Sequence, residues 1–151
     1  MAKLQFSPQI EARVRDSFSR QGFMKHLGAQ MTVVKEGEVE IRVPFRATLT
    51  QQHGYFHGGV SAAIADSASG YAAFTTMAPD SSVIAVEFKI NLVAPARGEE
   101  LVARARVVRG GRTLKICAAD VFGVKHGTET LCATMLSTIM ELAGKSDEAK
   151  S

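Results

Sequence analysis

Cysteines and metal-binding patterns are scarce in this sequence of 151 residues. There are only two cysteines, Cys117 and Cys132, and neither belongs to a CxxC or CxH pair of the kind that binds zinc. Both lie in apolar-rich segments, which predicts reduced thiols buried in the core. Three histidines, His26, His53 and His126, share no ligand spacing with one another or with a cluster of carboxylates. The sequence therefore gives no basis for a metal site.

Long apolar runs and blocks of like charge are absent as well. No apolar run is long enough to span a bilayer, and the segment from Met1 to Phe6 lacks the layout of a secretory signal, so we expect a cytoplasmic protein with no membrane partner. The formal charge of +3 comes from 18 basic and 15 acidic side chains spread along the chain. Without a basic block, nucleic acid is not an expected partner. The slight excess of positive charge is compatible with a small anionic ligand.

The length and the hydrophobic content of 46% allow one domain with a substantial core but not two domains of ordinary size. We place this single domain at residues 1–142. The remaining segment, residues 143–151, is mostly polar and shows no pairing pattern, so it is predicted to be a disordered tail.

Hydrophobic periodicity divides the first half of the domain into helices and a hairpin. Ser7-Pro8 is a typical helix start, and apolar residues then recur every four positions, which predicts a helix over residues 8–20. Gly22 and Gly28 bracket a short helical turn. Residues 31–45 alternate between apolar and polar side chains around a turn, as in a β-hairpin.

The central and C-terminal parts of the domain predict one buried helix followed by strands. Residues 58–74 are nearly all small or apolar, and a helix that is apolar on every side is normally buried on every side. Four extended segments follow, separated by short glycine-containing turns: residues 82–94, 99–109, 113–124 and 129–141. This order predicts an α+β fold in which a six-stranded antiparallel sheet wraps around one long helix.

Asp66 stands out because it places a carboxylate in the middle of this apolar helix. Burial deprives a carboxylate of solvation, and the nearest basic residues in the sequence, Arg46 and Lys89, are distant. Asp66 is therefore either a structural residue that bonds a neighbouring loop or a catalytic one.

The turn His57-Gly58-Gly59 precedes the same helix. The first amides of a helix have no intrahelical partner, and the helix dipole adds positive potential there, so the turn can bind a carbonyl oxygen that gains negative charge. The alternative is that the glycines serve only close packing. Because Gly58 and Asp66 are eight residues apart, or roughly 12 Å along a helix, one carbonyl carbon cannot contact both. If both residues serve catalysis, two antiparallel helices of an obligate dimer must supply them.

The spacing of His57-Gly58-Gly59, six residues and then Asp66 resembles the PaaI-type hotdog-fold acyl-CoA thioesterases and their mammalian mitochondrial relatives. The likeness extends from about Phe23 to Leu142. It implies the hotdog fold and hydrolysis of an aryl-, phenylacetyl- or medium-chain acyl-CoA to the free acid and CoA. Coenzyme A is part of the substrate, so no cofactor is implied, and similar proteins are commonly tetramers built from dimers.

The resemblance also assigns roles to residues of the motif. The resemblance implies that the Gly58 amide binds the thioester oxygen. It also implies that Asp66 is either the nucleophile or the base that activates water. Gln51 lies where PaaI-type proteins usually have an asparagine that holds the water, and glutamine there is similar to hydroxybenzoyl-CoA and dihydroxynaphthoyl-CoA thioesterases. Those relatives carry Glu on the helix and often Thr or Ser at the position of Gly70. His57 is expected to orient the loop and substrate, with direct proton transfer as the alternative.

Further residues are candidates for substrate binding. Gly59 and Phe56 adjoin the motif, and Ala85 occupies the place of a serine that assists water in some relatives, with Ser81 and Ser82 nearby. An acyl pocket could also include two aromatic residues that are otherwise simple core, Tyr71 and Phe74. The turn Arg109-Gly110-Gly111-Arg112 offers two guanidiniums for the CoA phosphates, unless it is an ordinary solvated turn.

Two other functions were weighed against hydrolysis. A non-catalytic module that binds or senses acyl-CoA would use the same fold, but it would not require the carboxylate of Asp66. A hydratase or dehydratase would need an acid and base pair placed at carbon, and the single helix carboxylate argues against it.

Overall fold

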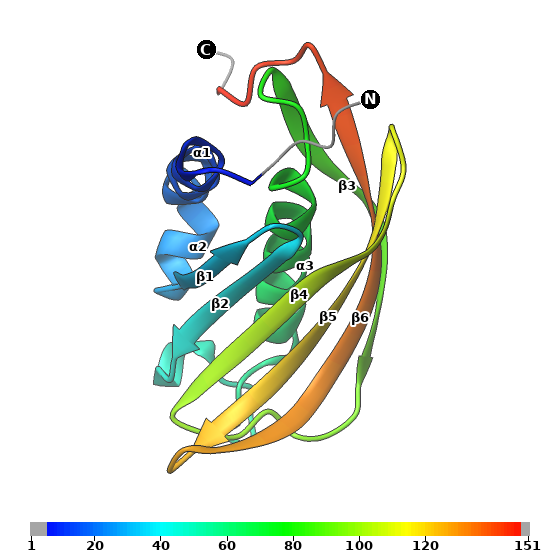
Figure 1. The fold of residues 1–151 in the computed structure, drawn as a ribbon. Coiled ribbons are helices and arrows are strands. Elements are labelled where there is room, and N and C mark those ends of the chain that lie inside the picture. Colours follow the sequence, from blue (N-terminus) through cyan, green and yellow to red (C-terminus); the bar gives the residue numbers. More distant parts are fainter. Residues whose placement is uncertain (1–5, 149–151) are drawn as a thin grey trace.

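The computed structural model describes residues 6–148 of the chain. Its elements are α1 (Pro8–Ser19), α2 (Gly22–Leu27), β1 (Gln30–Lys35), β2 (Glu38–Pro44), a 3-10 turn (Ala47–Leu49), α3 (Gly58–Phe74), β3 (Ser81–Leu92), β4 (Glu100–Gly110), β5 (Leu114–Lys125) and β6 (Thr128–Ala143). The predicted helices, hairpin and four later strands are all present, and the predicted α+β hotdog architecture is confirmed (Figure 1). No helix within residues 6–148 combines the length and apolar character needed to cross a membrane.

One antiparallel sheet contains all six strands, in the order β1-β2-β4-β5-β6-β3. The sheet curves around α3, while α1 and α2 lie on the open side of the helix (Figure 1). Because β3 pairs only with β6, it forms one edge of the sheet, and β1 forms the other. This placement of β3 could not be derived from the order of elements along the chain.

The core lies between the sheet and α3. Along α3, the residues that are fully buried include Ile64, Ala65, Ala68 and Ala72. The small alanine side chains let β2, β4 and β5 approach the helix closely, as the all-round apolar composition predicted. Both cysteines are free and buried, in agreement with the prediction that they are core residues.

Helix α1 packs beside the C-terminal half of α3. It begins at Ser7, whose hydroxyl accepts a hydrogen bond from the Ile10 amide at 3.4 Å. The guanidinium of Arg13 donates to the carbonyl oxygens of Phe74 and Ala78 at 3.0 and 2.6 Å and so satisfies the end of α3. One side of α3 is therefore covered by α1 instead of by the sheet.

The edge strand β3 is unusual because its apolar side chains are exposed. Ile84 and Val86 are each 51% exposed, Phe88 is 43% exposed and Leu92 is 60% exposed. A long apolar edge strand normally marks a surface that another chain or element covers.

The C-terminal segment was predicted to be disordered from residue 143, and the described part of it differs from that expectation. Strand β6 continues to Ala143, which pairs with Ser81. Further along, Asp147 forms an ion pair with Arg20 at the end of α1. Local sequence patterns do not predict this contact, because the two residues are 127 positions apart. Residues 149–151 of the predicted tail, and residues 1–5 at the other end, lie outside the described part.

Candidate active site

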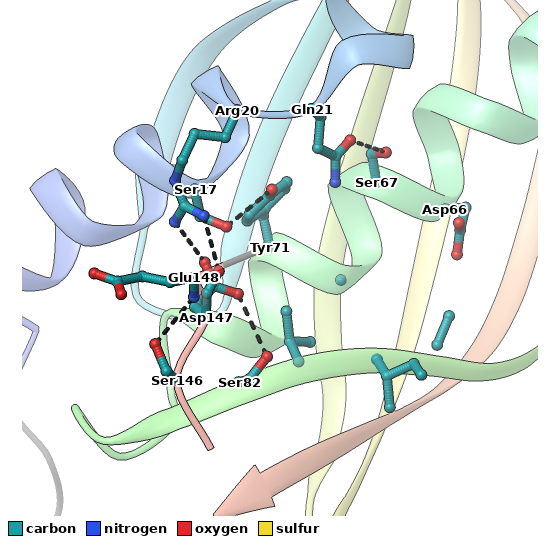
Figure 2. Close-up of a pocket in the computed structure, with 14 residues that line it drawn as sticks. Ser17, Arg20, Gln21, Asp66, Ser67, Tyr71, Ser82, Ser146, Asp147 and Glu148 are labelled. Carbon is teal, nitrogen blue, oxygen red and sulfur yellow. Dashed lines mark hydrogen bonds and ion pairs between the residues drawn. The ribbon is translucent and has the colours of Figure 1, made fainter. Parts of the chain in front are cut away.

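Asp66 projects from α3 into a cavity of about 400 Å³ between α1, α3 and β3, which we call the Asp66 pocket (Figure 2). One carboxylate oxygen, Oδ1, is buried and has no hydrogen-bond partner within residues 6–148. Burial raises the pKa of the Asp66 carboxyl above its ordinary value. The pocket is lined by Ser17 of α1, by Arg20 and Gln21 between α1 and α2, by Asp66, Ser67, Gly70 and Tyr71 of α3, by Ser82–Ala85 of β3, and by Ser146–Glu148.

A second cavity, of about 480 Å³, lies at the start of α3, and we call it the Gly58 pocket. Gly58 is the first helical residue, and its amide donates no hydrogen bond to any residue between 6 and 148. A side chain at position 58 would bring Cβ to 2.7 Å from a methyl carbon of Leu92. An unpaired amide at the positive end of the helix dipole is suited to bind an oxygen that carries negative charge.

His57 caps α3 through its own side chain. Its Nδ1 accepts a hydrogen bond from the Gly59 amide at 2.8 Å, so this nitrogen carries no proton. The contact fixes the turn and uses the Gly59 amide, which leaves Gly58 as the donor with a free N–H in the motif. His57 thus orients the turn, whereas protonation of Nδ1 would break its cap.

Gln51 and Phe56 line the Gly58 pocket, as their positions near the motif suggested. The side-chain oxygen of Gln51 accepts a hydrogen bond from the His53 amide, which holds the loop before α3. Phe56 is only 2% exposed and packs edge-on against Phe45, with 5.3 Å between the ring centroids. Phe56 is therefore a core residue and a pocket wall at once.

Ala85 and the two nearby serines take different positions along β3. Ala85 lines the Asp66 pocket. Ser82 lines it too, but its hydroxyl donates to Asp147 at 3.4 Å. Ser81 is buried and donates to the Ala78 carbonyl at 2.6 Å, away from Asp66. Of the aromatic residues, Tyr71 lines the pocket, and Phe74 is fully buried in the core.

The turn between β4 and β5 lies far from the Gly58 pocket of the same chain. Leu114 pairs with Met140, which also pairs with Ile84 near the start of β3. Gly58, in contrast, adjoins Leu92 at the end of β3. Three predicted phosphate-binding residues belong to this turn and line neither of the two pockets: Arg109, Gly110 and Arg112.

The two pockets share no lining residue, so this chain alone does not bring Gly58 and Asp66 to one substrate atom. Sequence reasoning missed Leu92 and Cys132 in the Gly58 pocket, because β3 and β6 reach it from far along the chain. It also missed Ser61, which lies one turn after Gly58 on α3. It also missed Arg20 and Asp147 in the Asp66 pocket. Residues 6–148 contain no group of three or more His, Cys, Asp or Glu side chains that could hold a metal ion.

Comparison with known proteins identifies the family and the fold. The family described as the thioesterase superfamily matches residues 53–130. A crystal structure of a thioesterase family protein from Silicibacter pomeroyi superimposes with a TM-score of 0.88 and 44% identity, covering 89% of this chain and 99% of that one.

Two further proteins are similar at lower identity. The PaaI protein of E. coli shares the fold, with a TM-score of 0.82 and 19% identity over 93% of this chain and 99% of its own. The 1,4-dihydroxy-2-naphthoyl-CoA hydrolase of Listeria monocytogenes is 25% identical over 95 residues, which are 63% of this chain and 77% of that protein.

Proposed function

The chain belongs to the thioesterase superfamily and is a thioester hydrolase, and from this premise we propose that its substrate is an aryl-, phenylacetyl- or medium-chain acyl-CoA. The observation that carries the proposal is the unpaired, buried oxygen of Asp66 in a pocket of acyl size. A carboxylate without a partner is costly unless a ligand or reactant uses it. The relative that acts on dihydroxynaphthoyl-CoA supports the choice of CoA as the leaving group.

In the proposed reaction, the Gly58 amide donates to the thioester oxygen while the carbonyl carbon is attacked. If Asp66 is the base, it takes a proton from water as the water oxygen bonds to that carbon. If Asp66 is the nucleophile, its oxygen bonds to the carbon and a water molecule later cleaves the anhydride. In both cases the C–S bond breaks, the electron pair leaves with the CoA sulfur, and the sulfur is protonated. Burial raises the pKa of Asp66, which makes the carboxylate both a stronger base and a stronger nucleophile.

A two-fold dimer along β3 would combine the two pockets. Leu92 lines the Gly58 pocket and Ala85 lines the Asp66 pocket, at positions roughly 23 Å apart on one strand. Antiparallel pairing of two β3 edges about an axis between Phe88 and Lys89 sets Leu92 of one chain opposite Ala85 of the other. The Gly58 pocket of each chain then meets the Asp66 pocket of its partner. The exposed apolar side chains of β3 supply the surface that such pairing buries.

The same pairing supports a role for the turn between β4 and β5 in binding CoA. This turn lies level with the start of β3, and the partner's strand runs in the opposite direction. The arginines of the turn in one chain therefore come to the level of the Gly58 pocket in the other. Arg109 and Arg112 are proposed to bind the CoA phosphates there, and two such dimers are proposed to form a tetramer.

Thiol release from a panel of aryl-, phenylacetyl- and straight-chain acyl-CoAs tests the activity, with the native protein and Asp66→Asn compared. We expect hydrolysis of at least one compound and a loss of about 10²-fold or more in kcat for the variant, the effect of removing a catalytic base. A native protein that binds acyl-CoA without hydrolysis would instead be a binding or sensing module.

Complementation between two inactive chains tests the shared site. Gly58→Pro removes the amide hydrogen, and Asp66→Asn removes the carboxylate. A heterodimer of the two variants, formed by co-expression with different tags, contains one site with both residues intact. We expect it to recover about half of the native activity per dimer, because one of its two equivalent sites is intact. A heterodimer as inactive as its parents would show that Gly58 and Asp66 do not act across an interface.

A further inference from the structure

The Asp66 pocket is closed at the end away from Asp66 by the C-terminal segment of the chain. Figure 2 shows Asp147 reaching toward α1 and β3 from this segment. The Arg20 guanidinium donates to the Asp147 carboxylate at 2.9 Å and to its main-chain carbonyl at 2.8 Å. The Ser82 hydroxyl donates to the other Asp147 carboxylate oxygen at 3.4 Å. Asp147 therefore connects three segments that line one cavity, and we call the Arg20–Asp147 pair the clasp.

The clasp lies along the direction in which an acyl group would extend. On α3, the pocket runs from Asp66 to Tyr71, about 8 Å along the helix axis. On β3 it runs from Ala85 to Ser82, about 10 Å along the strand. A thioester carbonyl at Asp66 thus leaves about 8 to 10 Å for the acyl group before it meets Arg20 and Asp147.

Burial distinguishes Asp147 from its neighbours. Its side chain is only 21% exposed, while Ser146 and Glu148 on either side are exposed. The ordering of this polar segment thus depends on one residue and its contacts. Ion pairs between solvent-accessible side chains are weak, so the clasp can hold the segment in place and still be displaced.

We infer that the clasp is the distal wall of the acyl pocket and restricts it to compact acyl groups. The inference rests on the proposed function, because it places the acyl group in the Asp66 pocket. Aryl and phenylacetyl groups fit in the space between Asp66 and the clasp. A long straight chain must break the ion pair and move Asp147 aside, so the clasp selects against it.

Binding of S-alkyl-CoA thioethers tests the wall without requiring hydrolysis. Hexyl- and dodecyl-CoA thioethers would be titrated by calorimetry into the native protein, Arg20→Asp, Asp147→Arg and the double variant with exchanged charges. We expect each single variant to improve dodecyl binding relative to hexyl by about three- to fivefold, the range that an exposed ion pair allows. The double variant with exchanged charges should restore the native ratio of dodecyl to hexyl binding. Arg15→Asp is the matched control, since Arg15 lies on the same helix but not in the pocket.

Cleavage after Lys145 by a lysine-specific protease gives a second measurement that is independent of catalysis, because this protease does not cut at the arginine that Asp147→Arg introduces. Lys145 is exposed and precedes Asp147 by two residues. Cleavage should be faster in both single variants and slow again in the charge exchange. Dodecyl-CoA thioether should accelerate it in the native protein, whereas hexyl-CoA thioether should not.

The outcomes separate this inference from the proposed function. If the thioethers show the expected pattern but no acyl-CoA is hydrolysed, the clasp stands and the proposed hydrolysis of acyl-CoA fails. If acyl-CoAs are hydrolysed but all four proteins have the same ratio of dodecyl to hexyl binding, the clasp is not a wall of the pocket. Equal cleavage rates after Lys145 in all four proteins would likewise overturn the inference.

Discussion

Glu40 and Asp66 are acidic residues on opposite sides of the structure, and their surroundings differ in how well they satisfy a carboxylate. Glu40 lies on the face of the sheet that points away from α3, and Asp66 lies on α3 itself. Glu40 is 9% exposed, and its hydrogen-bond partners favour the charged form. Asp66 is partly buried and one of its oxygens has no partner within the described residues.

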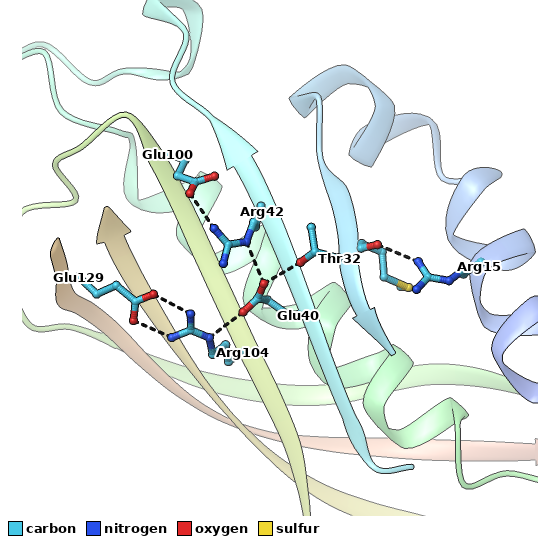
Figure 3. Close-up of polar contacts among 8 residues, drawn as sticks. Arg15, Thr32, Glu40, Arg42, Glu100, Arg104 and Glu129 are labelled. Carbon is cyan, nitrogen blue, oxygen red and sulfur yellow. Dashed lines mark hydrogen bonds and ion pairs between the residues drawn. The ribbon is translucent and has the colours of Figure 1, made fainter. Parts of the chain in front are cut away.

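The surroundings of Glu40 form a network across four strands, β1, β2, β4 and β6 (Figure 3). Its carboxylate accepts hydrogen bonds from Thr32 at 2.7 Å, Arg42 at 2.8 Å and Arg104 at 2.7 Å. The arginines also pair with Glu100 and Glu129. Burial opposes the ionisation of Glu40, but these hydrogen bonds outweigh burial and lower its pKa to about 2.

The comparison separates a carboxylate that stabilises the fold from one that is available for chemistry. Polar groups in a folded protein usually satisfy one another, and a site where they do not is a candidate for function. Along α3, both the Gly58 amide and an Asp66 oxygen are left open.

Removal of the open amide should affect activity far more than stability. Gly58→Pro deletes the N–H at the first helical position, where proline is tolerated, and His57 already has the extended backbone (φ −63°, ψ 139°) that a following proline requires. We expect kcat to fall about 10²–10³-fold, the effect of losing one oxyanion donor. Gly58→Ala adds the same Cβ contact with Leu92 but keeps the amide. If the two variants lose equal activity, crowding and not the lost amide explains the effect.

Neutralising the two carboxylates should change stability in opposite directions at neutral pH. Glu40→Gln should lower the free energy of unfolding by about 1–3 kcal/mol, because it weakens hydrogen bonds to two arginines. Asp66→Asn should leave this free energy unchanged or raise it, because it removes a buried charge without a partner. Urea denaturation of the two variants and the native protein measures both effects. A destabilised Asp66→Asn would argue for a structural Asp66.

The stabilising effect of Glu40 should disappear in acid. The folded-state pKa of Glu40 is lower than its ordinary value of 4.5, so its contribution is complete above pH 4.5 and is lost as the pH falls toward about 2. Glu40→Gln and the native protein should therefore converge in stability over this range.

The pH dependence of Asp66 should have the opposite sign. Its pKa is raised, so the cost of its charge develops as the pH rises from the ordinary value of 3.8 through the folded-state value. The acid limb of kcat/KM should report this raised pKa, and titration of activity measures it. An acid limb at or below the ordinary value would contradict a buried catalytic carboxylate.

The smallest expected effect concerns Gly70, which lines the Asp66 pocket one turn after Asp66. A Cβ at this position would meet no atom within 4 Å. Gly70→Ala should therefore raise the free energy of unfolding by about 0.5–1 kcal/mol, as expected for replacing glycine inside a helix. Thermal denaturation measures this gain. A loss of stability would show that the helix needs the glycine at this position.

Local patterns in the sequence were sufficient to predict most of the fold. Alternation, helix caps and the composition of residues 58–74 are properties of neighbouring residues, and they correctly predicted the central helix and the six strands. The His57-Gly58-Gly59 motif with Asp66 also indicated the family.

Contacts between distant segments were beyond these patterns. The pairing of β3 with β6, the approach of Leu92 to Gly58, and the ion pair of Arg20 with Asp147 each join residues far apart in the chain. The hydrogen bond from the Gly59 amide to His57 depends on a side-chain rotamer that spacing alone does not determine.

The bare edge of β3 has a consequence for how the protein behaves on dilution. An uncovered strand of this length with exposed Ile84, Val86 and Phe88 is a template for aggregation. In the proposed dimer, the pairing that completes each active site also removes this hazard. Specific activity and colloidal stability should therefore decline together at protein concentrations where the dimer dissociates.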